Sequence, residues 1–126
     1  MRKLWIVLVA AAFAGLLWPA DTDLAARGRD LFQRRCTGCH GLDNAKVGPA
    51  LRGVFGHRSA SGSGFPYSDA LKKAHVVWNE ATLDRWLTDP DSVAPDNDMA
   101  FRLDDAGERT AIIEYLKQLS TRREIR

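Results

Sequence analysis

Residues 29–53 read RDLFQRRCTGCHGLDNAKVGPALRG, and the five residues from Cys36 to His40 decide how this chain is read. They contain both cysteines of the 126-residue sequence, separated by two residues, and a histidine follows the second directly. The chain is long enough for one domain with a packed core. Its content of 45% hydrophobic and 27% charged residues is typical of a globular protein.

Several kinds of site use a cysteine pair at this spacing. A structural zinc ion takes four ligands, whereas this cluster supplies three at most. A redox dithiol normally follows a strand in an alternating pattern of strands and helices, but a helical segment precedes Cys36. A disulfide in a binding module without haem stays open, although it leaves His40 unexplained. Covalent haem attachment explains all three residues, because two thiols add to the vinyl groups of the porphyrin and the next residue, His40, comes under the iron.

An iron held by His40 needs a second axial ligand on its other face. Met1 lies in the N-terminal segment, and Met99 is the only other methionine. A methionine most often fills a gap in the core. Met99, however, ends a segment rich in aspartate and proline and belongs to no helical stripe. We therefore expect His40 and Met99 to be the axial ligands, a pair that raises the redox potential and suits an electron carrier.

The first twenty residues differ from the rest of the chain. Arg2 and Lys3 precede seventeen uncharged residues, Leu4 to Ala20. This pattern indicates an export signal, and a retained anchor is the alternative because about 20 apolar residues span a bilayer. We expect residues 1–20 to be a signal peptide or an N-terminal membrane anchor and residues 21–126 to form one domain. That domain is expected to be periplasmic, either soluble or tethered to the inner membrane.

The charge of the domain excludes some partners. The whole chain has 18 basic and 16 acidic residues, and two of the basic residues lie within residues 1–20. Residues 21–126 are therefore formally neutral, which does not favour binding to nucleic acid. Contact with a membrane is expected only if the N-terminal segment is retained, and we expect a monomer.

The pattern along the domain predicts an all-α fold with three to five helices. Helical spacing of apolar residues favours helices over residues 21–35, 68–73, 79–88 and about 104–119. Ser68 and Asn79 are the predicted N-caps of the second and third helices. Glycine-rich residues 41–68 are expected to be irregular and ordered around a ligand. Residues 89–98 are expected to form an exposed loop.

These segments, taken in order over residues 24–119, resemble the mitochondrial and short bacterial cytochromes c. GRDLFQRRCTGCH resembles the first helix of that family and AIIEYLKQL the last, with Gly28, Phe32 and Tyr115 where the two helices cross. The resemblance implies a class I, monohaem cytochrome c whose terminal helices cross beside one covalently attached haem c. It implies a one-electron carrier without enzymatic activity.

Four further segments, VGPALRGVFG, GFPYSDAL, VVWNEATLDRWLTDP and DNDMAF, are similar to the parts of the family that surround the haem. With Cys36 and Cys39 as attachment points and His40 and Met99 as iron ligands, the resemblance implies haem contacts from Pro49, Leu51, His57, Tyr67, Trp78, Trp86, Asn97 and Phe101.

The resemblance also implies what several of these residues do. The Pro49 carbonyl orients the imidazole of His40, and Leu51 packs on the haem. Tyr67 and Trp78 donate hydrogen bonds to a propionate, since a buried hydroxyl or indole N–H needs a partner. Phe101 shields the exposed edge of the haem.

The chain departs from the family at several positions. Trp86 stands in place of a tyrosine at the methionine sulfur, and Asn97 in place of a hydroxyl residue. His57 replaces an arginine near the inner propionate. Because histidine changes its charge near neutral pH and arginine does not, we form the hypothesis that the redox potential depends on pH.

The segment before Met99 also lacks lysines. Asp91, Ser92 and Asp98 occupy positions that are lysines in the mitochondrial members, so docking is expected to be less electrostatic, while Arg34, Arg35 and Lys46 lie near the attachment motif.

The expected partners are redox proteins: a quinol-cytochrome c reductase, a terminal oxidase or a dehydrogenase. Two alternatives remain open. One is a haem peroxidase-like enzyme in which Met99 is a labile ligand. The other is an electron-transfer subunit of a larger oxidoreductase complex.

Overall fold

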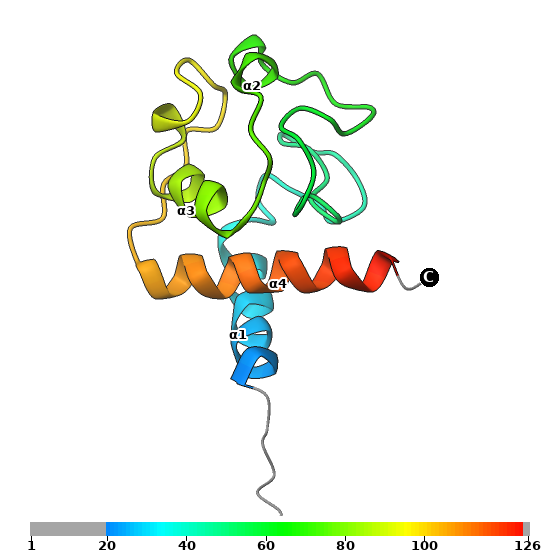
Figure 1. Ribbon diagram of the computed structural model, residues 1–126, viewed down its shortest axis with the longest axis vertical. Helices are drawn as coiled ribbons and strands as arrows, with labels where there is room; N and C mark the ends of the chain where they lie inside the picture. Colours follow the sequence, from blue (N-terminus) through cyan, green and yellow to red (C-terminus); the bar gives the residue numbers. More distant parts are fainter. Residues whose placement is uncertain (1–19, 125–126) are drawn as a thin grey trace, which may run out of the picture.

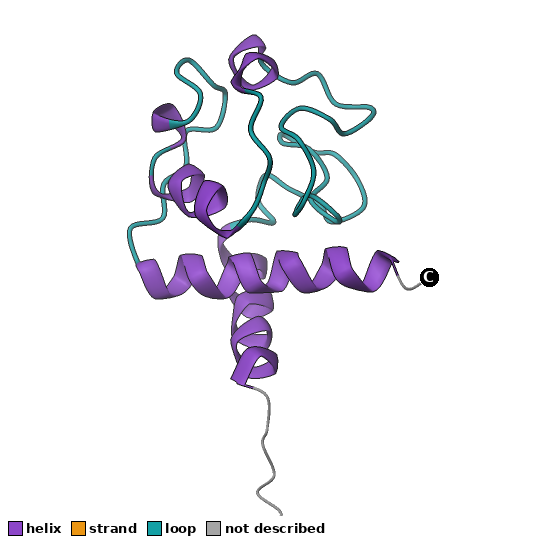
Figure 2. Ribbon diagram, viewed as in Figure 1, coloured by secondary structure: helices purple, strands orange, loops and turns teal. Residues whose placement is uncertain are grey.

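The computed structural model describes residues 20–124, which form four α-helices and one 3₁₀ turn (Figure 1). In chain order these are α1 (Ala20–Arg35), α2 (Asp69–Ala74), α3 (Glu80–Thr88), η1 (Pro90–Ser92) and α4 (Ala106–Glu124). The described residues form no strand, only an isolated antiparallel bridge between Arg58 and Val77. Figure 2 shows long loops on one side of the molecule, above the crossing of α1 and α4. The expected all-α fold is confirmed.

The first and last helices cross where α1 carries a glycine. A Cβ atom at Gly28 would overlap the carbonyl oxygen of Ala111 in α4 and would lie 2.9 Å from Cβ of Tyr115. Beside this contact, the rings of Phe32 and Tyr115 pack with their centroids 5.7 Å apart. Phe32 and Ala111 are fully buried. The absence of a side chain at one position therefore lets two helices approach to backbone contact.

The third helix begins at Asn79, the predicted N-cap, and the structure adds a capping box. The side chain of Asn79 accepts a hydrogen bond from the backbone N–H of Thr82, and Oγ1 of Thr82 accepts one from the N–H of Asn79. Such reciprocal bonds satisfy two N–H groups that have no partner within the helix. The buried face of α3 consists of Leu83, Trp86 and Leu87. Trp86 packs edge-on against Trp78, which precedes the helix, at 5.4 Å between centroids.

An arginine in α4 joins three parts of the chain. Nε of Arg109 donates to Oδ1 of Asp84 in α3 at 2.7 Å, and its Nη1 donates to the carbonyls of Leu103 and Asp104 at 2.8 Å each. The Arg109 side chain is only 11% exposed. Hydrogen bonds to a charged group are stronger than neutral ones. Arg109 therefore fixes α3 and the segment before α4 in one arrangement.

Two expectations from the sequence are wrong in part. The last helix begins at Ala106, close to the expected start, and Asp105 caps it by accepting a hydrogen bond from the N–H of Glu108. The helix continues to Glu124 and does not end at residue 119. Residues 89–98 are not simply an exposed loop, since Pro90 and Ala94 are buried and η1 forms there.

Residues 1–20 were predicted to be a signal peptide or a membrane anchor. Apart from Ala20, this segment lies outside the described residues. Within residues 20–124, no helix is both long enough and apolar enough to cross a bilayer.

The crossing of α1 and α4 makes a prediction about stability. Replacement Gly28→Ala is expected to lower the free energy of unfolding by about 3 kcal/mol, because the new methyl group must push one helix backbone away from the other. Gly107→Ala in α4 is the matched control, since its Cβ would meet only side-chain atoms at 3.2 Å or beyond. Denaturant unfolding of the haem-bearing proteins measures both changes, and equal effects of the two replacements would contradict the prediction.

Candidate cofactor pocket

A cavity lies between the crossed helices and the loops. Its volume is about 750 Å³, within the range of about 300–1,000 Å³ that is common for small-molecule and cofactor sites. The end of α1, the loops of residues 47–68, the helix α3, the segment 97–101 and the middle of α4 all contribute to its walls. All twelve residues that the sequence assigns to a haem line this cavity: Cys36, Cys39, His40, Pro49, Leu51, His57, Tyr67, Trp78, Trp86, Asn97, Met99 and Phe101.

The imidazole of His40 is oriented by a backbone carbonyl. Its Nδ1 lies 2.8 Å from the carbonyl oxygen of Pro49. A carbonyl can only accept, so Nδ1 carries the proton and Nε2 keeps the lone pair with which an imidazole binds a metal. Backbone hydrogen bonds from Gly48 to Cys39 and from Leu51 to Gly41 fold this loop back onto the motif. The histidine is thereby held ready to bind a metal through Nε2.

A glycine next to this ring was not identified from the sequence. A Cβ atom at Gly48 would lie 2.7 Å from Nδ1 of His40 and would overlap the neighbouring ring carbon. Gly48 therefore leaves space for the imidazole. Its position directly before Pro49, in VGPALRGVFG, is the only signal of this role in the sequence.

The two cysteines lie at the cavity as unpaired thiols, Cys36 half-buried and Cys39 exposed. Burial, with a smaller contribution from Cys39, raises the pKa of the Cys36 thiol to about 11. Both thiols thus lie at the cavity wall with His40, where the attachment points of a haem are expected.

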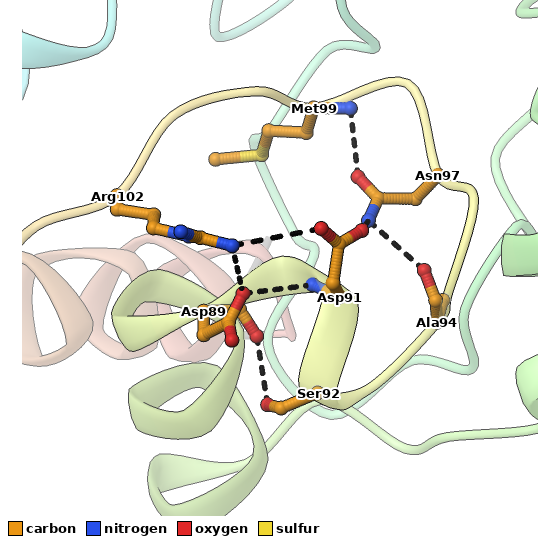
Figure 3. A network of polar contacts seen from close by, with 7 residues as sticks. All are labelled: Asp89, Asp91, Ser92, Ala94, Asn97, Met99 and Arg102. Carbon is orange, nitrogen blue, oxygen red and sulfur yellow. Dashed lines mark hydrogen bonds and ion pairs between the residues drawn. The ribbon is translucent and has the colours of Figure 1, made fainter.

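Met99, which is distant from the Cys36–His40 motif in the sequence, lines the same cavity. Nε1 of Trp86 donates a hydrogen bond to the Met99 sulfur at 3.2 Å. The backbone N–H of Met99 donates to Oδ1 of Asn97 at 2.7 Å (Figure 3). The sulfur and the main chain of this residue are therefore both held by named partners, and the cavity contains a thioether as well as an imidazole.

Two hydrogen-bond donors at the cavity wall lack a protein partner within residues 20–124. Trp78 is only 5% exposed, yet its Nε1 donates to no protein acceptor, and the same holds for the hydroxyl of Tyr67. Buried indole and phenol groups usually find an acceptor. The acidic edge of a haem supplies such acceptors, while Leu51 and Phe101 offer apolar contacts. The donors, the imidazole, the thioether and the two thiols together fit a covalently bound haem.

Basic residues also line the cavity. Arg35 was expected near the attachment motif, whereas Arg52 and Arg58 were not identified from the sequence; they line the cavity in addition to His57, whose side chain is exposed. The backbone N–H of Trp78 donates a hydrogen bond of 2.9 Å to the carbonyl of His57, and this bond fixes the main chain of His57. Arg58 follows His57 directly, and this position beside a predicted haem contact was the only sign in the sequence that Arg58 would line the cavity. A contact between His57 and a propionate stays a prediction.

Comparisons with known proteins agree with this pocket. The family model Cytochrome c matches residues 25–120. The chain is 42% identical to cytochrome c of Chlamydomonas reinhardtii over 97 residues, which cover 74% of this chain and 87% of the relative. It is 42% identical to cytochrome c2 iso-2 of Magnetospirillum molischianum, over 67% of this chain and 90% of the relative. The solved structure of cytochrome cH from Methylobacterium extorquens superposes with a TM-score of 0.71 at 40% identity and covers 75% of this chain and 97% of that one.

The packing of His40 makes a prediction. Gly48→Ala is expected to lower the free energy of unfolding of the haem-bearing protein by about 2 kcal/mol, because the methyl group and the imidazole cannot occupy the same space. Gly38→Ala is the control, since a Cβ there meets nothing within 4 Å although it lies in the same motif. Denaturant titration followed by haem absorbance compares the two variants, and an unchanged midpoint for Gly48→Ala would count against the packing described.

Proposed function

Because this protein belongs to the cytochrome c family, we propose that it carries single electrons between the redox proteins of a respiratory chain outside the cytoplasm. We propose His40 and Met99 as the iron ligands. Family membership makes it an electron-transfer haem protein with one covalent haem c, and members of the family are carriers and not enzymes. The ligand set, the cellular location and the partners are our proposals.

One observation carries the proposed ligand set. Cys36, Cys39 and His40 come from one short motif, whereas Met99 is separated from them by most of the domain, and all four line the same cavity. Thiols attach a haem to the chain, and an imidazole and a thioether complete its coordination. The orientation of His40 by Pro49 supports the same set, because it leaves Nε2 available.

The haem, when bound, supplies the one-electron couple of its iron. The chain supplies orientation and polarity. The Pro49 carbonyl makes the imidazole of His40 a stronger donor to a metal. The indole of Trp86 can only donate, so its hydrogen bond draws electron density from the Met99 sulfur and favours the reduced state. Trp78 and Tyr67 offer N–H and O–H groups to the propionates, and Leu51 and Phe101 exclude water.

The proposed location follows from the N-terminal sequence. Arg2 and Lys3 followed by seventeen uncharged residues form the pattern of an export signal. Covalent attachment suits an exported protein, which cannot easily recover a lost cofactor. We propose that the domain works in the periplasm, released or tethered by this segment, between a quinol-cytochrome c reductase or a dehydrogenase and a terminal oxidase.

The charges near the cavity bear on these partners. Asp96 and Asp98 are exposed beside the Met99 segment, while Arg34, Arg35 and Lys46 lie near the attachment motif. Arg35 also pairs with Glu108 at 3.3 Å. The rim thus carries both signs of charge, and a partner with a strongly acidic face gains little steering from it.

The spectrum and mass of the matured protein test the proposed function. We expect the intact mass to include one haem and the ferric protein to show the long-wavelength band of a sulfur-to-iron bond. Met99→Ala is expected to abolish that band and to lower the redox potential by on the order of 100 mV, within the about 0.8 V range that axial ligands control. Val47→Ala, at an exposed residue of the same cavity, is the control. A polypeptide without haem, or a Met99→Ala variant with an unchanged band, would refute the proposal.

The mixed rim predicts a weak dependence on salt. Between ionic strengths of about 0.01 and 0.15 M, the rate constant for oxidation by a terminal oxidase with an acidic docking face should fall less than about threefold. A ring of like charges would change such rates about 10- to 1,000-fold. Asp98→Lys is expected to steepen the dependence, because it adds a positive charge at an exposed position. A steep fall for the unmodified protein would contradict the partner proposal.

A further inference from the structure

The segment that carries Met99 is held by polar contacts more than by burial. Ala94 and Leu103 are buried on either side of it. Between them, Asp96, Asp98 and Ala100 are exposed, and no part of residues 95–102 is helical. The apolar anchors are therefore at the ends of the segment, and the contacts of its polar side chains determine where the Met99 main chain lies.

One asparagine makes the central contact. Oδ1 of Asn97 accepts from the N–H of Met99 at 2.7 Å, and Nδ2 donates to Oδ1 of Asp91 and to the carbonyl of Ala94 at 2.9 Å each. Figure 3 shows the amide between these partners. A flipped amide would direct its oxygen at a carboxylate and a carbonyl and its NH₂ at an N–H, so the orientation is fixed by its surroundings. Asp91 therefore aligns Asn97, and Asn97 in turn aligns Met99.

An arginine closes the same network from the other side of the methionine. Nη2 of Arg102 donates to Oδ1 of Asp89 at 2.7 Å and lies 3.5 Å from Oδ2 of Asp91. Both aspartates flank the start of η1, whereas Arg102 follows Met99 by three residues (Figure 3). We call Asp89, Asp91, Asn97 and Arg102 the polar clasp, because they join the start of η1 to the residues on both sides of Met99.

We propose that the polar clasp is a positioning device that keeps the Met99 sulfur in the cavity, so that its strength sets how readily a small external ligand replaces Met99 on the iron. The inference rests on the proposed axial role of Met99 and adds the residues that control it. Asn97 contributes most, because its loss leaves both the Met99 N–H and the Asp91 carboxylate without this partner. Arg102 contributes less, since its side chain is 55% exposed and water screens its ion pairs.

Binding of imidazole to the ferric, full-length, haem-bearing protein tests the clasp. We expect Asn97→Ala to raise the apparent affinity for imidazole about 5- to 30-fold, because it removes the three hydrogen bonds of the Asn97 side chain, each of modest net strength. Asp91→Ala should give a smaller increase in the same direction, and Arg102→Ala less than about fivefold. Because the residues act through one network, the double variant of Asp91 and Asn97 should bind imidazole about as tightly as Asn97→Ala alone.

Two controls separate the clasp from general destabilisation. Ser92→Ala removes a hydrogen bond within η1, from Ser92 Oγ to the Asp89 carbonyl, but none to Asn97 or Met99. Ile113→Val trims a buried side chain of α4 that does not line the cavity. Both should change the imidazole affinity less than twofold, even though Ile113→Val lowers the stability of the whole domain.

The outcomes distinguish this inference from the proposed function. If the unmodified protein lacks the sulfur-to-iron band, the axial role of Met99 fails, and the clasp fails with it. If the band is present and Asn97→Ala and Asp91→Ala bind imidazole as the unmodified protein does, only the clasp is refuted. Should Asn97→Ala not mature with haem, the single variants Asp91→Ala and Arg102→Ala decide the question by the same measurement.

Discussion

The approach of α1 to α4 at Gly28 is the constraint on which the other parts of this protein depend. Backbone contact at Ala111 fixes how α1 crosses α4, and Cys36, directly after α1, lines the same cavity as Ile112 and Leu116 of α4. The helix α3 packs on α4 from another side and is joined to it by Arg109 and Asp84. The attachment motif therefore follows directly on a helix that is in backbone contact with α4. A motif on a looser helix could not hold its histidine in a fixed relation to residues nearly sixty positions away.

The loops of residues 41–68 illustrate how a small domain orders long irregular segments. They contain few buried apolar residues, and their hydrogen bonds are mostly short-range turns, together with the contacts from Gly56 and Ser59 to the segment 76–78. These loops form part of the cavity wall. A covalent haem in the cavity supplies the apolar surface that the loops themselves lack. Covalent attachment thus acts on folding as well as on function, because the cofactor completes the core.

Around Met99, the side chains that contact the sulfur and the main chain differ from those that the resemblance implies for the family. An indole N–H contacts the sulfur, and an amide aligned by a carboxylate contacts the main chain. The aspartates near Asn97 also make the segment before Met99 acidic, where the resemblance implies lysines in the mitochondrial members. Under the proposed roles, the residues that align Met99 and the residues that a partner meets are partly the same, so the proposal links docking to retention of Met99 through Asp91.

The sequence by itself determined the attachment motif, the helix caps at Ser68 and Asn79, the all-α class and a set of residues that line the cavity. These features depend on local spacing or on a motif whose chemistry needs particular residues in a particular order. Only the tertiary structure decided the role of Gly48, the burial of Pro90 and Ala94, the position of Arg109 and the partners of Asn97. Each depends on atoms brought together from distant parts of the chain, and the pattern of neighbouring residues carries no record of which distant group will lie opposite.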